Sequence, residues 1–178
     1  MNKTLIHGLA FTALFSLAFT QAHAQTQDTN ITTAPSASSA SAQTAVDPAD
    51  KNKQIGAKFM EENKTKSDVV TLPSGLQYSI VEAGTGKKPG ANDMVTVDYE
   101  GKLLNGKVFD SSYARKQSAT FPVSGVIAGW QEALQLMNEG ATWMLYIPPN
   151  LAYGADGAAP AIGPNETLVF KVHLIKVQ

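Results

Sequence analysis

One short stretch of the chain places a charge beside an aromatic ring. Residues 105–112 read NGKVFDSS, so Asp110 directly follows Phe109, just after an Asn-Gly hairpin signal. A carboxylate at this place has two interpretations. It can end the strand or cap a following helix, or it can line the edge of a pocket together with the ring of Phe109. Other features of the sequence are needed to distinguish these two interpretations of Asp110.

Most catalytic schemes are excluded by the residue types that are present. The 178-residue chain contains no cysteine, which rules out disulfides, thiolate nucleophiles and cysteine metal sites. Of its histidines, His7 and His23 precede residue 25, and His173 alternates with apolar residues as a solvated strand residue does. No serine-nucleophile motif, carboxylate metal spacing or P-loop is present. A formal charge of −1 also argues against nucleic acid. We therefore expect no metal site and no nucleic-acid partner.

The remaining candidates are aromatic and fall on different predicted elements: Tyr99, Phe109, Trp130, Tyr153 and Phe170. One hypothesis is that these rings only form the core. The other is that they line an apolar pocket, which is the usual design of a binding site. The Gly- and Pro-rich segments SGVIAGW and AYGADGAAPAIGPNET favour the pocket, since a long ordered loop is uncommon without a function.

Alternating apolar residues predict the strands that would position these rings. In MVTVDYEGK, one face carries Val95, Val97 and Tyr99. TWMLYI and VFKVHLIK repeat the pattern, and LQYSIV and TFPV are shorter strand candidates. The connections are too short for repeated parallel crossovers. The sequence therefore predicts an α+β domain in which an antiparallel sheet packs against a helix.

A single stretch of this domain has helical spacing, IAGWQEALQLMNEG. Its apolar residues recur at intervals of three and four, and we expect the helix to end at Gly140. The predicted buried face consists of Trp130, Ala133, Leu134 and Met137.

The first 24 residues have the pattern of a secretory signal peptide. Lys3 precedes the apolar run LIHGLAFTALFSLAFT, and AHA before Gln25 is a cleavage site. The run is short for a membrane span, so we expect no stable membrane insertion. Export without cysteine favours a bacterial periplasmic or secreted protein. A eukaryotic lumen stays open, because Asn30 and Asn165 lie in glycosylation sequons.

The segment between the signal and the predicted sheet divides into two parts. Residues 25–46 are rich in Thr, Ser and Ala and contain few large apolar residues, which predicts a disordered tether. Residues 47–66 begin with Asp47 and Pro48, the cap and first position of a short N-terminal helix. Ile55 and Phe59 share one face of this helix, and Gly56 weakens it. Whether it docks on the domain at 71–178 or hangs loosely is left open.

Several motifs, in order, resemble one family. VDYEGKLLNGKVFDSS, VSGVIAGWQEALQLMNEG, LAYG and IGPNETLVFKVHLIKV are similar to FKBP-type peptidyl-prolyl cis/trans isomerases. LPSGLQY and GPNETL resemble the bacterial macrophage-infectivity-potentiator (Mip-like) branch. The resemblance covers residues 72–178. It implies a bent antiparallel sheet wrapped around one short helix.

The resemblance also implies roles for particular residues, each taken from its own motif. Asp110 becomes the carboxylate at the pocket rim, acting on a tyrosine hydroxyl or electrostatically on the rotating carbonyl. The catalytic group implied is Phe109, Asp110, Ile127 and Tyr153. The substrate pocket implied is Tyr99, Phe121, Val126, Trp130, Ile162 and Phe170.

The implied activity is isomerisation of X-Pro bonds in exported polypeptides, with macrolides of the rapamycin type as a second ligand class. The implied reaction needs no cofactor. The alternatives are a client-binding chaperone module with little turnover and an adhesin-like structural domain. Ala158 stands where many eukaryotic members have a histidine, and Ala119 replaces an aromatic, so both bear on macrolide affinity and substrate preference. Dimeric Mip-like relatives carry a long N-terminal helical region. Because this chain offers only a short helix, we expect a monomer.

Overall fold

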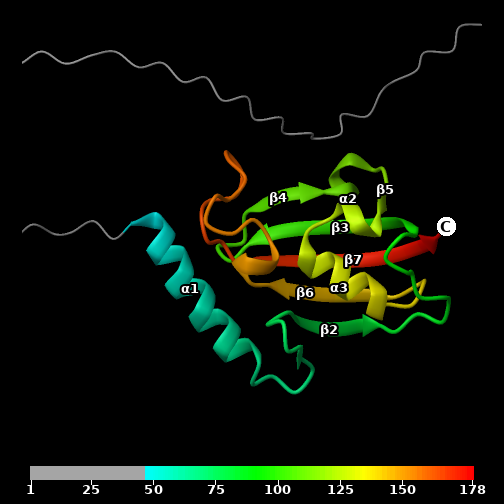
Figure 1. The fold of residues 1–178 in the computed structure, drawn as a ribbon, viewed down its shortest axis with the longest axis horizontal. Helices are drawn as coiled ribbons and strands as arrows, with labels where there is room; N and C mark the ends of the chain where they lie inside the picture. Colours follow the sequence, from blue (N-terminus) through cyan, green and yellow to red (C-terminus); the bar gives the residue numbers. More distant parts are fainter. Residues whose placement is uncertain (1–46) are drawn as a thin grey trace, which may run out of the picture. The chain divides into compact units, whose positions relative to one another are not determined.

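The computed structural model of the chain describes residues 47–178. The predicted signal peptide (1–24) and the predicted tether (25–46) lie outside the described residues. Figure 1 shows that the described part consists of one antiparallel sheet together with short helices. No helix within residues 47–178 is long and apolar enough to cross a membrane.

The sheet has seven strands in the order β1-β2-β6-β7-β3-β4, and β5 pairs with β3 beside β4. Every pairing is antiparallel, as the short connections predict. The strands are β1 (Val70–Thr71), β2 (Gln77–Glu82), β3 (Met94–Leu103), β4 (Val108–Ser111), β5 (Ala119–Pro122), β6 (Thr142–Ile147) and β7 (Leu168–Val177).

Strand β3 is paired along one edge by two different strands. Its first half pairs with β5 and its second half with β4, and the short helix α2 (Ser112–Arg115) lies between those two strands in the chain. Neither strand pairs with β3 at Tyr99, where the backbone N–H donates instead to the hydroxyl of Ser112 at 2.8 Å. A buried backbone donor needs such a partner, so Ser112 completes the strand edge.

The predicted alternation in the three central strands is confirmed. Along β3 every second residue from Val95 to Leu103 is buried. Strands β6 and β7 bury their apolar faces in the same way. Their inward side chains form one continuous core that includes Trp143, Leu145, Ile147, Phe170, Val172 and Leu174.

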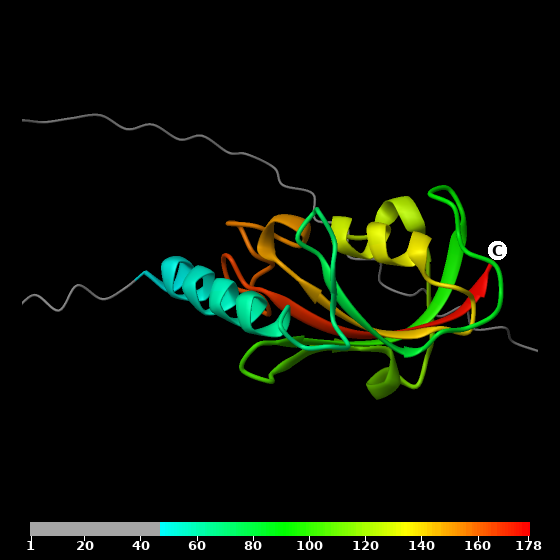
Figure 2. The ribbon, with the colours of Figure 1, turned by 90° about the horizontal axis from the view of Figure 1, so that it is seen from below.

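Helix α3 (Ala128–Leu136) packs against this core, and Figure 2 shows it on one side of the sheet. Its buried face is the predicted one: Trp130, Ala133 and Leu134, followed by Met137. Gly129 allows the close approach, because a Cβ atom there would lie 2.6 Å from Cγ2 of Ile147.

The predicted end of this helix at Gly140 is wrong. The helix ends at Leu136, and Met137 has extended backbone angles (φ −76°, ψ 143°). The side chain of Met137 is fully buried, and the extended turn keeps it in the core while the chain leaves the helix. Gly140 has φ +85° and lies in the turn that precedes β6, where its N–H donates to the carbonyl of Leu174.

Helix α1 (Pro48–Asn63) begins as predicted but is shorter than the predicted 47–66 segment. Asp47 caps it by accepting from the Ala49 N–H at 2.9 Å. The helix docks on the sheet. Buried Asn63 donates to the side chain of Gln77, which donates in turn to the Met60 carbonyl, both at 2.9 Å.

Two short 3₁₀ helices complete the described elements. η1 (Val123–Gly125) follows β5, and η2 (Pro149–Leu151) follows β6. Each introduces a loop that carries candidate site residues: Val126 and Ile127 after η1, and Tyr153 and Ile162 after η2.

Candidate active site

Five aromatic rings from five elements form one cluster around Trp130. The indole meets the rings of Tyr99 and Phe170 edge to face, with centroids 5.3 Å apart in each pair. It meets Phe121 in the same way at 6.3 Å, and Phe109 contacts Phe170 at 5.4 Å. The perpendicular arrangement is the favoured one for aromatic pairs. The sheet and α3 therefore bring together all the predicted aromatic residues except Tyr153.

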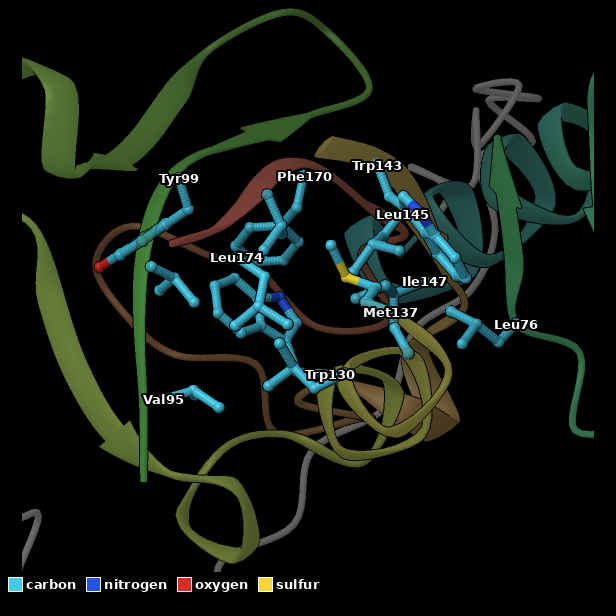
Figure 3. Close-up of a cluster of buried hydrophobic side chains, with 14 of the residues drawn as sticks. Leu76, Val95, Tyr99, Trp130, Met137, Trp143, Leu145, Ile147, Phe170 and Leu174 are labelled. Carbon is cyan, nitrogen blue, oxygen red and sulfur yellow. The ribbon is translucent and has the colours of Figure 1, made fainter. Parts of the chain in front are cut away.

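Figure 3 shows how two of these residues lie in the buried cluster. Trp130 projects from α3 toward the inner strands, and Tyr99 points its hydroxyl away from the buried cluster. Trp130 and Phe170 are almost fully buried, whereas Phe109 and Phe121 are half-buried. Within residues 47–178 the buried indole N–H of Trp130 has no hydrogen-bond partner. Core and candidate pocket are thus one continuous aromatic surface, and the two hypotheses of the sequence are compatible.

Val126 and Ile127 border this cluster at the start of α3. Both are half-buried and pack against the core. Gln131, one turn into the helix, donates from its side chain to the Val126 carbonyl at 2.7 Å and so holds the segment in place. Ile127 is the N-cap residue and provides no capping side chain. Because the first N–H groups of a helix lack intrahelical acceptors, this end of α3 offers backbone donors to a bound molecule.

Asp110 is held by two neighbours. The hydroxyl of Tyr99 donates to its carboxylate, and so does the guanidinium of Arg115. Arg115 also donates to the Tyr99 hydroxyl oxygen at 3.0 Å, with its guanidinium carbon 5.7 Å from the centre of the tyrosine ring. The helix cap is the adjacent Ser111, whose hydroxyl accepts from the Ala114 N–H. Asp110 is therefore not the capping residue of the first interpretation.

The surroundings of the two tyrosines keep their hydroxyls protonated. Burial and the hydrogen bond to Asp110 raise the pKa of Tyr99 to about 12, although Arg115 acts in the opposite direction. Burial raises the pKa of Tyr153 as well, and the charge of Asp110 adds to that effect. The bonds to Asp110 and Tyr99 raise the pKa of Arg115. Like any tyrosine, both are protonated at neutral pH and can donate a hydrogen bond, and the raised pKa extends this to more alkaline pH.

Tyr153 and Ile162 lie on the long loop between η2 and β7. Ile162 is almost fully buried, and its backbone pairs with Ala158 through two hydrogen bonds of 2.9 Å. Tyr153 is 41% exposed. Burial raises the pKa of the Tyr153 hydroxyl, and the negative charge of Asp110 adds to the effect.

Three residues that the sequence did not indicate support the site: Gly101, Ser112 and Arg115. A Cβ atom on Gly101 would lie 2.6 Å from the ring of Phe109 and 2.7 Å from that of Phe170, so the absence of a side chain lets these rings meet. A glycine at an inward position of an alternating strand was a signal for this. Nothing in the spacing of Ser112 or Arg115 pointed to their roles.

Within residues 47–178 no group of three histidine, aspartate or glutamate side chains could hold a metal ion. A surface cavity of about 660 Å³ lies away from the aromatic cluster, between the start of α1 and the turn from β3 to β4. Its lining includes Ile55, Leu104 and Glu166 but none of the predicted site residues.

Comparison with known proteins identifies related sequences along most of the chain. Residues 85–175 match the model of the FKBP-type peptidyl-prolyl cis-trans isomerase family. Residues 5–80 match the model of the domain amino terminal to FKBP-type peptidyl-prolyl isomerase. The first match contains every predicted site residue.

Two curated relatives are similar over about seven tenths of the chain. The peptidyl-prolyl cis-trans isomerase Mip of Coxiella burnetii is 57% identical over 71% of this chain and 55% of its own length. The outer membrane protein MIP of Legionella longbeachae is 55% identical over 73% of this chain and 56% of its own. The chain thus spans little more than half the length of these relatives.

Two crystal structures have the same fold. FkpA from Escherichia coli superimposes with a TM-score of 0.71 and 44% identity, covering 73% of this chain and 61% of FkpA. A peptidyl-prolyl cis-trans isomerase from Pseudomonas syringae superimposes with a TM-score of 0.69 and is 42% identical. The match covers 74% of this chain and 96% of the isomerase. These likenesses confirm the predicted antiparallel α+β fold.

The raised pKa of Tyr99 predicts a loss of stability in alkali. Between pH 10 and 12 the unfolded chain has released this proton and the folded chain has not, so the free energy of unfolding falls as the pH rises. Below pH 10 Tyr99 is protonated in both the folded and the unfolded chain, so its full contribution to the free energy of unfolding is present. A shift from 10 to about 12 corresponds to a loss on the order of 2 kcal/mol.

Urea unfolding of the natural chain and of Tyr99→Phe at pH 9 and pH 12 measures this loss. The natural chain should lose more stability than the variant over the interval, because the other tyrosines contribute equally to both. Parallel losses would show that Tyr99 ionises alike in the folded and unfolded chains.

Proposed function

The chain belongs to the family of FKBP-type peptidyl-prolyl cis-trans isomerases, and we propose that it accelerates the rotation of X-Pro bonds in polypeptide substrates. The observation that carries the proposal is the aromatic cluster around Trp130 with the paired carboxylate of Asp110 at its edge. An apolar surface with few polar groups suits a proline ring and the flanking peptide.

The reaction breaks no bond, so the site has to lower a rotational barrier. An amide resists rotation by about 18–20 kcal/mol because resonance gives its C–N bond partial double-bond character. Water stabilises the polar, planar amide more than the twisted one, which has lost that resonance. A dry aromatic site removes this difference and therefore favours the twisted form relative to the planar one.

The side chains divide into two groups in this mechanism. Trp130, Tyr99, Phe121 and Phe170 hold the proline ring. Phe109 borders it from β4. Val126 and Ile162 extend the apolar wall from the two loops.

The donors of the site would fix the substrate backbone on either side of the proline. The Ile127 N–H at the start of α3 and the Tyr153 hydroxyl, which is protonated at neutral pH, are such donors. Asp110 acts as an acceptor that orients Tyr99 and presents a negative charge to the rotating amide. It is not a general base, because the reaction requires no proton transfer.

A proline-isomerisation assay on the purified chain tests the proposal. We expect the chain to raise the cis/trans rate of an X-Pro peptide well above the uncatalysed rate, which has a time constant of roughly tens to hundreds of seconds. Macrolides of the rapamycin type should compete with the peptide. Binding of proline peptides without acceleration would favour the client-binding chaperone module instead.

Asp110→Ala should separate chemistry from folding. Its side chain is 39% exposed, so truncation removes little core volume and should change stability by no more than about 0.5–1 kcal/mol. Turnover should fall severalfold or more. By contrast, Trp130→Ala removes a ring that belongs to both core and pocket and should cost about 3–5 kcal/mol.

The denaturation midpoint and the isomerisation rate are measured on the same Asp110→Ala sample, with Trp130→Ala as the contrasting variant. A collapse in stability, with normal turnover by the molecules that remain folded, would make Asp110 a structural residue and remove it from the site.

Export and a monomeric mature form complete the proposal. The relative from Legionella is described as an outer membrane protein, which supports a location outside the cytoplasm for this chain too. We propose cleavage after Ala24, a tether at residues 25–46 and a periplasmic or secreted monomer. After expression in a bacterium with an intact export pathway, the measured mass of the purified protein should equal that of a chain beginning at Gln25. Light scattering should give the mass of one such chain. Twice that mass at micromolar concentration would contradict the monomer.

A further inference from the structure

Helix α1 makes direct contacts with the loop that carries Tyr153. The side-chain amide of Asn52 donates to the Pro164 carbonyl at 2.9 Å, and the side chain of Asn165 donates to the Ala49 carbonyl at 3.4 Å. Figure 1 shows the loop, in orange, near the first turns of α1. Helix and loop are more than 100 residues apart in the sequence at both contacts.

Asn165, in the segment of the loop that α1 contacts, is hydrogen-bonded to Gly154 beside Tyr153. The Asn165 N–H donates to the carbonyl of Gly154 at 2.8 Å, and the Gly154 N–H donates to the Pro149 carbonyl at 2.8 Å. Gly154 directly follows Tyr153. A path of hydrogen bonds therefore leads from α1, across the Pro164–Asn165 segment, to Gly154, the residue that directly follows Tyr153.

The loop is packed against the core in part and exposed in part: Ala152, Ala158 and Ala161 pack against the core together with buried Ile162. Ala155, Asp156, Ala159 and Pro160 are exposed, and Ile162 is its one almost fully buried large side chain. Fixing each backbone residue costs about 1–2 kcal/mol of conformational entropy. The hydrogen bonds from α1 add to this packing at the Pro164–Asn165 segment.

Gly56 is a separate sign that α1 is shaped to fit this loop. A glycine in the middle of a helix is less favourable than alanine by about 0.5–1 kcal/mol. Here a Cβ atom would lie 2.3 Å from the hydroxyl oxygen of Thr167, which is buried and has no hydrogen-bond partner within residues 47–178. The glycine lets the helix lie directly against the end of the loop.

We propose that α1 is a positioning element of the active site. Through Asn52 and Gly56 it holds the segment from Pro164 to Thr167, and through the Asn165–Gly154 hydrogen bond it sets the orientation of Tyr153. The inference rests on the proposed isomerase activity for its effect on rate. The docking itself can be measured without turnover.

The first experiment follows amide hydrogen exchange in the natural chain and in Asn52→Ala. Loss of the bond to Pro164 should raise the exchange rate of the Asn165 amide about three- to tenfold, as expected for one hydrogen bond worth about 0.5–1.5 kcal/mol. Lys58→Ala is the matched control, because Lys58 lies on the same helix with its side chain exposed and forms an ion pair with Glu62 of that helix. An unchanged Asn165 amide in Asn52→Ala would overturn the proposal, whatever the rates of isomerisation.

The second experiment asks whether the effect on rate passes through Tyr153. Asn52→Ala should lower kcat/KM severalfold relative to Lys58→Ala, and this loss should disappear when Tyr153→Phe is already present, since coupled residues are not additive. A loss of the same size in both backgrounds would overturn the proposal. If the natural chain shows no turnover, the proposed function is wrong. The exchange experiment would still test whether α1 holds the loop.

The third experiment uses Gly56. In an unconstrained helix Gly56→Ala would stabilise the chain by about 0.4–1 kcal/mol. In this chain, Gly56→Ala should instead raise the exchange rate of the Asn165 amide and lower kcat/KM. Adding Thr167→Ala removes the hydroxyl oxygen that the new methyl group would meet, so the double variant should recover most of the original exchange rate and kcat/KM. Stabilisation by Gly56→Ala alone, with exchange and rate unchanged, would refute the close fit of helix and loop.

Discussion

The packing of Trp130 between α3 and the sheet is the interaction on which the other features of the domain depend. The indole is almost fully buried and meets the rings of Tyr99 and Phe170 edge to face. It therefore joins the helix to β3 and β7 and at the same time forms the floor of the proposed pocket. The same contacts stabilise the fold and shape the site, so the pocket needs no separate framework. As a consequence, Trp130 cannot be replaced by a smaller residue without weakening the domain.

The polar groups of the site are arranged around this apolar surface. A carboxylate beside aromatic rings is unfavourable unless it is solvated or paired, and Asp110 is both partly exposed and bonded to Tyr99 and Arg115. Those bonds direct its charge and keep Tyr99 protonated. Ser112, two residues further on, closes the gap in the edge of β3. The segment from Asp110 to Arg115 thus completes the sheet and supplies the electrostatics of the pocket rim.

The N-terminal helix α1 and the sheet are joined by direct side-chain contacts. The buried pair of Asn63 and Gln77 anchors one end of α1 to β2, and the contacts of Asn52 and Gly56 bring its other end to the loop of Tyr153. A buried polar pair is satisfied only when both partners are in place, so it specifies one docked position rather than a range of them. Substitutions in this helix can therefore reach the site without touching a substrate.

The sequence by itself determined the strand faces, the buried face of α3, the start of α1 and the family, because these depend on local periodicity, on capping chemistry and on motifs that are short and contiguous. It also determined that Asp110 is set beside an aromatic ring. Only the tertiary structure decided what that carboxylate bonds, why Gly101 has no side chain, and that α3 ends at Leu136 because Met137 is drawn into the core. The docking of α1 was decided there too. Each of these rests on contacts between side chains whose partners lie on neighbouring elements or more than 100 residues away, and no local pattern in the sequence specifies such partners.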